Sequence, residues 1–194
     1  MDLRQRRKLD TTRLIHEAAV ALARDNGLDG VTIEDICKAA GISQRTFFNY
    51  FPFKEAAFVF PPPVLSSEAA ARFVAANGDM MSELIDLMAA QAVEMTKGPW
   101  GGSLIREIAI AHPRVVPLQM AEFQKFESEL AKLIAKRLGA KTGDVRCAAL
   151  AGAFIGAART ATDRWRQDER ADLPRLVREG LEGFVETVRS SSSK

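Results

Sequence analysis

The segment from Gly41 to Glu55, which reads Gly-Ile-Ser-Gln-Arg-Thr-Phe-Phe-Asn-Tyr-Phe-Pro-Phe-Lys-Glu, constrains the fold more than any other part of the chain. Gly41 permits the backbone conformation of a sharp turn, and Ser43 can cap a following helix by accepting a backbone N–H bond. In that helix Phe47 and Phe51 lie four residues apart and share one face, which we expect to point inward. The segment therefore predicts a tight turn, a short helix and the start of a further helix.

The same short helix carries side chains that are suited to reading DNA. Gln44, Arg45 and Asn49 fall away from the inward face, where they can meet a partner. Arginine can form two hydrogen bonds with the edge of guanine, and asparagine and glutamine can do the same with adenine. These residues therefore predict a contact with base edges in a major groove.

The segment before the turn predicts two further helices. Residues 33–40 place their apolar side chains on one stripe of a helix, formed by Ile33, Ile36, Cys37 and Ala40. Thr32 is a suitable N-cap for this helix. Upstream, a longer amphipathic helix is expected from about Asp10 to Asp25, with Asn26-Gly27 at its end. Three helices with a short glycine-containing turn between the last two form a helix-turn-helix unit.

Residues 10 to 58 resemble the DNA-binding region of the TetR family of transcriptional regulators. The resemblance rests on the order of residues in 31–33 (Val-Thr-Ile), in 39–41 (Ala-Ala-Gly), and in 50–55 (Tyr-Phe-Pro-Phe-Lys-Glu). It implies an all-α fold with a helix-turn-helix domain at residues 1–60 and a helical ligand-binding and dimerisation domain at residues 61–194. It also implies a homodimer that binds a double-stranded operator.

From the motif and the resemblance together we expect DNA contacts from Thr32, Ser43, Gln44, Arg45, Thr46, Phe48, Asn49, Tyr50 and Lys54.

Two positions depart from the family pattern. Phe48 stands where the family often has a tyrosine whose hydroxyl meets a phosphate, and phenylalanine can stack or pack but cannot donate. Phe53 stands where the family usually has a residue that caps the next helix. The phosphate contact expected at that helix therefore depends more on Lys54 and on backbone N–H groups.

Charge is distributed unevenly along the chain. The 194 residues carry a net charge of only +2, but basic residues crowd the N-terminus: Arg4, Arg6, Arg7, Lys8 and Arg13. Such an arm suits phosphates or a minor groove. The alternative is a solvated, disordered tail, and the adjoining helix-turn-helix favours the contact with DNA.

Beyond the proline run at residues 61–63, which marks the expected domain boundary, every substantial segment has the pattern of a helix. The expected helices run from Ser67 to Ala76, Asp79 to Lys97, Leu104 to Ala111, Arg114 to Leu138, Asp144 to Gln167 and Leu173 to Arg189. No stretch shows the alternation of a strand, so the sequence predicts an all-α fold.

Glycines recur inside the last two long helices, where they weaken a helix unless packing needs them. Gly152 and Gly156 lie four residues apart, and Gly180 and Gly183 lie within the final helix. Small residues let two helix backbones approach closely. That approach can be within one chain, or it can form a dimer interface of two helices from each subunit, which the resemblance implies and which we prefer.

The middle helices are rich in thioether and aromatic side chains. Residues of these types at helical spacing are most often simply core. The alternative is a pocket for an effector, and its expected lining is Met88, Trp100, Phe123 and Phe126, beside the break at residues 98–102. Polar groups are few there, so we expect a mostly apolar compound and not a sugar or nucleotide.

The sequence offers little for catalysis or metal binding. His16 and His112 are isolated, and Cys37 and Cys147 form no cluster with other ligands. A lone histidine of this kind is more often a surface or capping residue than a ligand. No phosphate-binding glycine loop, nucleophile motif, cofactor motif, signal peptide or membrane span is found, and a soluble, cytoplasmic protein is expected.

These observations predict a TetR-type repressor, not an enzyme, which binds a palindromic operator as a homodimer and is released by a small effector. Two alternatives remain. One is an architectural DNA-binding protein or an activator without a small-molecule effector. The other is a helical enzyme, which the absence of a catalytic constellation disfavours.

Overall fold

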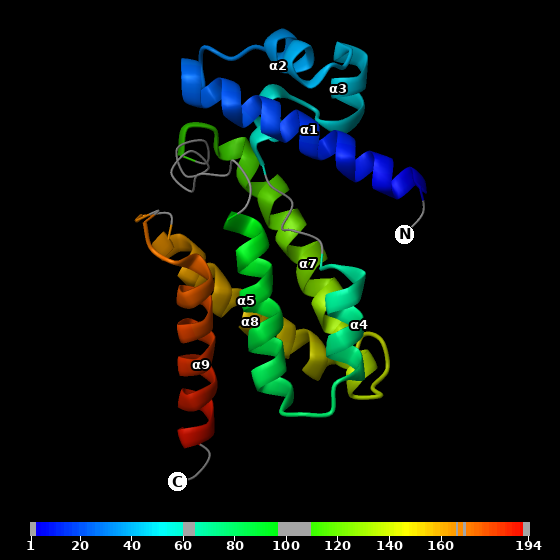
Figure 1. The fold of residues 1–194 in the computed structure, drawn as a ribbon, viewed down its shortest axis with the longest axis vertical. Coiled ribbons are helices and arrows are strands. Elements are labelled where there is room, and N and C mark those ends of the chain that lie inside the picture. The colour runs from blue at the N-terminus through cyan, green and yellow to red at the C-terminus, as the bar shows by residue number, and fades with distance from the viewer. Residues whose placement is uncertain (1–2, 60–64, 97–109, 166, 169, 192–194) are drawn as a thin grey trace. The chain divides into compact units, whose positions relative to one another are not determined.

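The computed structural model of the chain describes residues 3–59, 65–96, 110–165, 167–168 and 170–191 (Figure 1). Regular structure in these residues is helical throughout, with eight α-helices and two short 3-10 helices among them. The predicted all-α class is confirmed. The chain divides into two units: Met1–Phe60 with Gly98–Met120, and Pro61–Lys97 with Ala121–Lys194.

This division differs from the expected one in a single respect, which is that the segment 98–120 belongs with the N-terminal helices. The reason is packing. Val115 is 2% exposed and lies in the same apolar core as the first three helices, and Leu118 packs against that core.

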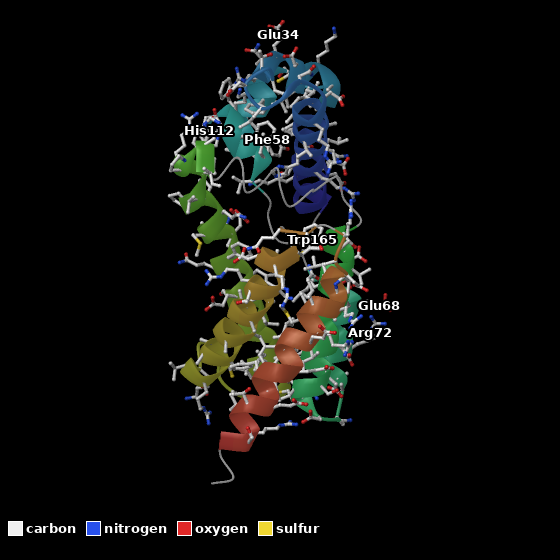
Figure 2. The ribbon with its side chains drawn as sticks, turned by 90° about the vertical axis from the view of Figure 1, so that its left-hand side faces the viewer. Glu34, Phe58, Glu68, Arg72, His112 and Trp165 are labelled. Atoms are coloured by element: carbon white, nitrogen blue, oxygen red, sulfur yellow. The ribbon has the colours of Figure 1, made fainter. Side chains whose placement is uncertain are left out.

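The first unit contains α1 (Leu3–Asn26), α2 (Ile33–Ala40) and α3 (Gln44–Tyr50), followed by the 3-10 helices η1 (Lys54–Phe58) and η2 (Pro113–Val115). Its core is built from the inward faces of these helices and includes Ile15, Ile36, Phe47 and Phe58, each no more than 1% exposed. Figure 2 shows Phe58 on the inner side of this unit.

Helix α1 begins seven residues earlier than the sequence predicted, at Leu3 instead of Asp10. Arginine, glutamine and lysine are good helix formers, and they continue the helix toward the N-terminus. Within it, the hydroxyls of Thr11 and Thr12 donate to the carbonyls of Arg7 and Lys8 at 2.9 and 2.8 Å. The basic arm is therefore part of a helix.

The helix after α3 is a 3-10 helix, η1, with Phe53 at its N-cap position and no side-chain capping bond. This agrees with the expectation that phenylalanine at this position caps the helix poorly, since it has no acceptor to offer to the first N–H groups.

The second unit contains α4 (Ser67–Ala75), α5 (Met80–Thr96), α8 (Val145–Trp165) and α9 (Leu173–Ser191), together with all but the first turn of α7 (Val116–Arg137). Helix α9 packs against both α5 and α8. The fully buried side chains of this unit include Leu84, Leu130, Ile134, Phe154 and Leu181. The sequence placed the ends of these five helices to within two residues, whereas most of the helix expected at 104–111 lies outside the described residues.

The buried side chain of Arg137 stabilises the loop between α4 and α5. Arg137 is 6% exposed at its side chain, pairs with Glu83 and donates to the carbonyls of Phe73 and Gly78 at 3.2 and 3.1 Å. Its guanidinium lies 4.8 Å from the centre of the Phe73 ring. Because Glu83 also accepts a bond of 3.0 Å from the backbone N–H of Gly78, the pair joins the end of α7 to both sides of the loop.

On the exposed side of α4, Glu68 and Arg72 form a solvent-facing pair 3.5 Å apart (Figure 2). Such exposed pairs contribute little to stability. None of the described helices has the length and apolarity to cross a membrane.

Candidate nucleic-acid interface

Helix α2 is fixed at both ends by local hydrogen bonds. The Thr32 hydroxyl accepts from the backbone N–H of Asp35 at 3.1 Å, and the Asp35 carboxylate accepts from the Thr32 backbone N–H at 3.1 Å and from its hydroxyl at 2.5 Å. The bonds from the Thr32 hydroxyl and backbone hold the pKa of Asp35 below its usual value. This reciprocal capping box sets the start of α2.

The end of α2 and the start of α3 form the predicted turn. Gly41 has φ of +65°, a left-handed conformation that favours glycine. The Ser43 hydroxyl then accepts from the Thr46 backbone N–H at 3.1 Å and lies 2.8 Å from the Thr46 hydroxyl. Both predictions about the turn, the glycine at its start and the serine cap, are confirmed.

Helix α3 separates an inner from an outer face. Phe47 and Phe51 are 0% and 8% exposed and pack into the core, as the sequence predicted. Tyr50 is half-buried against the same core. The other side of α3 is exposed and carries two pairs of residues on successive turns. These four residues form the outer face of α3: Gln44, Arg45, Phe48 and Asn49.

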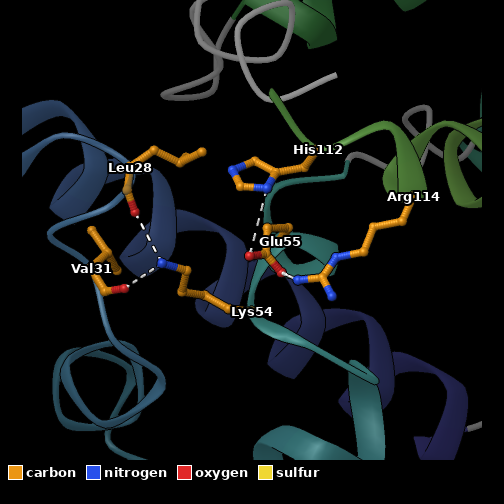
Figure 3. A network of polar contacts seen from close by, with 6 residues as sticks. All are labelled: Leu28, Val31, Lys54, Glu55, His112 and Arg114. Atoms are coloured by element: carbon orange, nitrogen blue, oxygen red, sulfur yellow. Dashed lines mark hydrogen bonds and ion pairs between the residues drawn. The ribbon is translucent and has the colours of Figure 1, made fainter. Parts of the chain in front are cut away.

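Lys54 has a structural role that the sequence did not reveal. Its ammonium group donates to the carbonyls of Leu28 and Val31 at 3.1 and 2.8 Å, across the turn between α1 and α2 (Figure 3). An ammonium group has three N–H donors, so these two bonds leave one for another acceptor. A phosphate contact by Lys54 stays a prediction.

Glu55, next along η1, is buried at 7% exposed and lies against two basic side chains (Figure 3). Arg114 of η2 forms an ion pair with it, and His112 Nδ1 lies 3.9 Å from its Oε1. Burial alone would raise the pKa of Glu55, but its own backbone N–H and the bond from Arg114 outweigh burial and hold the pKa below its usual value. Arg114 also lies over the Phe53 ring, 4.4 Å from its centre.

His16 lies inside the first unit at 1% exposed, whereas the sequence favoured a surface or capping position. Its Nδ1–H donates to the carbonyl of Ala57, and its ring meets Phe51 edge-on with the centroids 5.0 Å apart. Burial lowers the pKa of His16 to about 4, so the ring is neutral at pH 7. Its partners, Phe51 and Ala57, lie far along the chain from His16, so no local sequence pattern indicates these contacts.

The basic N-terminal segment presents Arg7 and Lys8 as exposed side chains on the first turns of α1. Arg13, one and a half turns further on, is paired with Glu17 at 2.7 Å. The side chains of Arg4 and Arg6 lie outside the described part of the structure.

Three of the four residues expected to line an effector pocket, Met88, Phe123 and Phe126, lie in the second unit. Met88 of α5 and Phe126 of α7 are 4% and 9% exposed and belong to the same apolar core. Phe123, on α7, is half-buried. Trp100 lies outside the described residues. Among the described residues no group of histidine, cysteine, aspartate and glutamate side chains could hold a metal ion, and Cys37 and Cys147 are buried free cysteines.

Two family models match the chain. Residues 15–59 match the model for bacterial regulatory proteins of the tetR family. Residues 106–189 match the model for the MftR C-terminal domain. The first match runs from the middle of α1 to just after η1, and the second runs from before η2 to near the end of α9.

Relatives and solved structures agree with these matches. A protein of Mycobacterium tuberculosis described as the mycofactocin biosynthesis transcriptional regulator MftR is 27% identical over 173 residues, which are 87% of this chain and 86% of that protein. A tetR-family regulator from Streptomyces coelicolor has a similar fold, with a TM-score of 0.59 and 21% identity over 95% of this chain and 82% of that one. The repressor FadR from Thermus thermophilus, solved with lauroyl-CoA, has a TM-score of 0.57 and 24% identity over 88% of this chain and 91% of that one.

Proposed function

We propose that this chain, which belongs to the TetR family of transcriptional regulators, is a repressor that binds a palindromic operator as a homodimer and is released by a small, mostly apolar effector. The family is one of DNA-binding regulators and not of enzymes. The observation that carries the proposal is the outer face of α3, where Gln44, Arg45 and Asn49 are exposed while the opposite face packs into the core.

In this proposal the outer face of α3 enters the major groove. Arg45 bonds to a guanine, and Asn49 and Gln44 bond to adenines, because these side chains match those base edges in pairs of hydrogen bonds. The remaining predicted contacts position the helix on the phosphates: Thr32, Ser43, Thr46, Tyr50 and Lys54. The capping bonds of Thr32 and Ser43 support this by holding the N-termini of α2 and α3 in place.

The basic start of α1 contributes phosphate contacts in this proposal. A minor groove is about 6 Å wide, whereas an α-helix with its side chains is about 10 Å across. Because residues 3–26 are helical, the segment cannot thread into a minor groove. Arg7 and Lys8 are exposed and can bind phosphates from outside the groove.

Glycines on α8 and α9 support the proposed homodimer. A side chain placed at Gly152 would meet the Glu127 carboxylate at 3.2 Å, so this glycine has a neighbour inside the chain. At Gly156, Gly180 and Gly183 an added Cβ would meet no described atom within 4 Å. Within the part of the chain that the structure describes, no close approach explains these three glycines, and a second copy of the chain can supply a partner for them.

The dimer interface is tested by Gly156→Leu. A leucine at this open position would hold the partner helices apart, and overfilling a packed contact costs about 1–3 kcal/mol. Sedimentation should show more monomer and weaker operator binding at low protein concentration. Ala71→Leu, at an exposed site on α4, is the matched control and should stay dimeric. A Gly156→Leu protein that dimerises as tightly as the control would refute the interface.

The effector in this proposal lies among the helices of the second unit. Met88 and Phe126 support this, because both are apolar and share a buried cluster. A thermal-shift screen of apolar, cationic and acyl compounds would find candidates. The ligand of FadR provides a useful pair of probes: lauroyl-CoA joins an apolar chain to phosphates, and laurate carries the chain alone. A response restricted to phosphate-bearing compounds would contradict a mostly apolar effector.

The operator is tested directly by selection. The full-length protein is mixed with a pool of random DNA duplexes, and bound sequences are recovered over several rounds. We expect two inverted half-sites about one helical turn apart, and a complex of one protein dimer per duplex in sedimentation. Recovery of unrelated sequences would favour an architectural DNA-binding protein, and release by no compound in the screen would favour a regulator without an effector.

A further inference from the structure

We infer that Phe48 is a specificity-determining residue that reads the methyl group of a thymine in the operator. The inference rests on the proposed operator binding and assigns one base contact within it. Phe48 is 52% exposed, which makes it a large apolar side chain on the surface of α3.

The position of Phe48 on α3 places it among the base-reading side chains. It lies one turn after Gln44, three residues after Arg45 and directly before Asn49, and all four residues are exposed. Phe48 is thus the apolar member of a face whose other members can bond to base edges.

The ring of Phe48 lies at the surface of the first unit, in contact with a buried ring of the core. It meets the buried ring of Phe47 edge-on, with the centroids 5.6 Å apart and the planes at 87°. Edge-on aromatic pairs are favourable. This contact steadies the Phe48 ring while more than half of the residue stays open to a partner.

The chemistry of phenylalanine limits which groups of the DNA can bind to this ring. The side chain has no hydrogen-bond donor or acceptor. A phosphate or a polar base edge that packed against it would give up hydrogen bonds to water and gain none in return, which costs free energy. In the major groove, the apolar group that a base edge presents is the C5 methyl of thymine, and phenylalanine is among the side chains that contact it. A tyrosine at this position would have a hydroxyl for a phosphate. Phenylalanine favours the methyl group instead.

The test removes one methyl group at a time from the DNA. An operator half-site selected by the full-length protein is synthesised with deoxyuridine in place of each thymine in turn, which deletes the C5 methyl and leaves every hydrogen bond. We expect one position at which affinity falls about four-fold per half-site, the change that corresponds to burying one methyl-sized group. Substituting that position in both half-sites should lower affinity about fifteen-fold if the two contacts add.

Protein variants assign the effect to Phe48. Phe48→Ala should bind the thymine and deoxyuridine operators equally well, while Phe48→Leu, which keeps an apolar side chain, should retain part of the difference. Gln44→Ala is the matched control from the same face: it should weaken binding but keep the full deoxyuridine penalty. Because Phe48 is largely exposed, the variants should fold, and thermal melting followed by circular dichroism checks this.

Several results would overturn the inference. They are a selected half-site without thymine, no deoxyuridine position that lowers affinity, or a penalty of the same size in Phe48→Ala. A uniform loss of affinity in Phe48→Ala on every sequence would place the ring against the DNA backbone. In each of these cases selective binding by the wild-type protein would leave the proposed function standing, whereas failure to select any sequence would remove both.

Discussion

Lowering the pH from 7 to 5 should destabilise the first unit through one side chain, His16. The imidazole is buried beneath η1, and its pKa lies at about 4 because burial disfavours the charged ring. In the unfolded chain the same ring has a pKa near 6.5. Between these two values the unfolded chain takes up a proton that the folded chain does not.

The size and the sign of the effect follow from these two pKa values. The stabilisation is fully present above about pH 6.5 and is lost as the pH falls toward 4. The expected loss is about 2 kcal/mol at pH 5 and about 3 kcal/mol at pH 4. Asp35 and Glu55, whose pKa values are lowered, lose stabilisation only as their unfolded carboxylates protonate, below about pH 4.5. The interval from pH 7 to 5 therefore separates the effect of His16 from that of these two carboxylates.

Native-state hydrogen exchange of the α1 amides measures the effect within the first unit, independently of the second. After correction for the intrinsic exchange rate, a loss of about 2 kcal/mol should lower protection about 30-fold between pH 7 and 5. In His16→Gln, which keeps an N–H donor for the Ala57 carbonyl but does not titrate, the pH dependence should vanish. Equal protection of the wild-type protein at both pH values, or an unchanged loss in His16→Gln, would refute the reasoning.

Three further predictions concern other parts of the molecule. Arg137→Leu should lower the stability of the second unit by about 1–3 kcal/mol in denaturant unfolding, because the carbonyls of Phe73 and Gly78 lose their donor and the partly buried Glu83 carboxylate loses its cation; an unchanged stability would contradict this. Lys54→Ala should weaken binding to all sequences alike and reduce the salt slope by about one unit, whereas altered base preference with an unchanged slope would rule out a phosphate contact. Phe126→Trp should abolish the effector response in an operator-release assay while operator affinity stays intact, and a normal response would remove Phe126 from the pocket.

Local rules predicted the helix-turn-helix well. The φ of +65° at Gly41, the cap at Ser43 and the cap at Thr32 depend on neighbouring residues, which the sequence displays directly. The same is true of the inward face of α3, because Phe47 and Phe51 follow the period of the helix. Such features need no knowledge of the rest of the fold.

Contacts between distant residues were not predictable in this way. His16 meets the carbonyl of Ala57, 41 residues away, and Glu55 pairs with Arg114, 59 residues away. Lys54 reaches back 26 and 23 residues to two carbonyls at the turn between α1 and α2. Periodicity and capping carry no information on such partners. The early start of α1 was missed for another reason, since a run of basic residues suits a helix and a flexible arm equally.

The measurement that tests the central claim most directly is a base-by-base binding scan of the selected operator with wild type, Arg45→Ala and Arg13→Ala. Arg45 lies on the outer face of α3, whereas Arg13 is paired with Glu17 on α1 and serves as the matched arginine control. Arg45→Ala should relax preference at one base pair of each half-site by about 1–3 kcal/mol, and Arg13→Ala should leave the base preferences unchanged. If Arg45→Ala weakened binding to every sequence alike, α3 would not be the element that reads the operator.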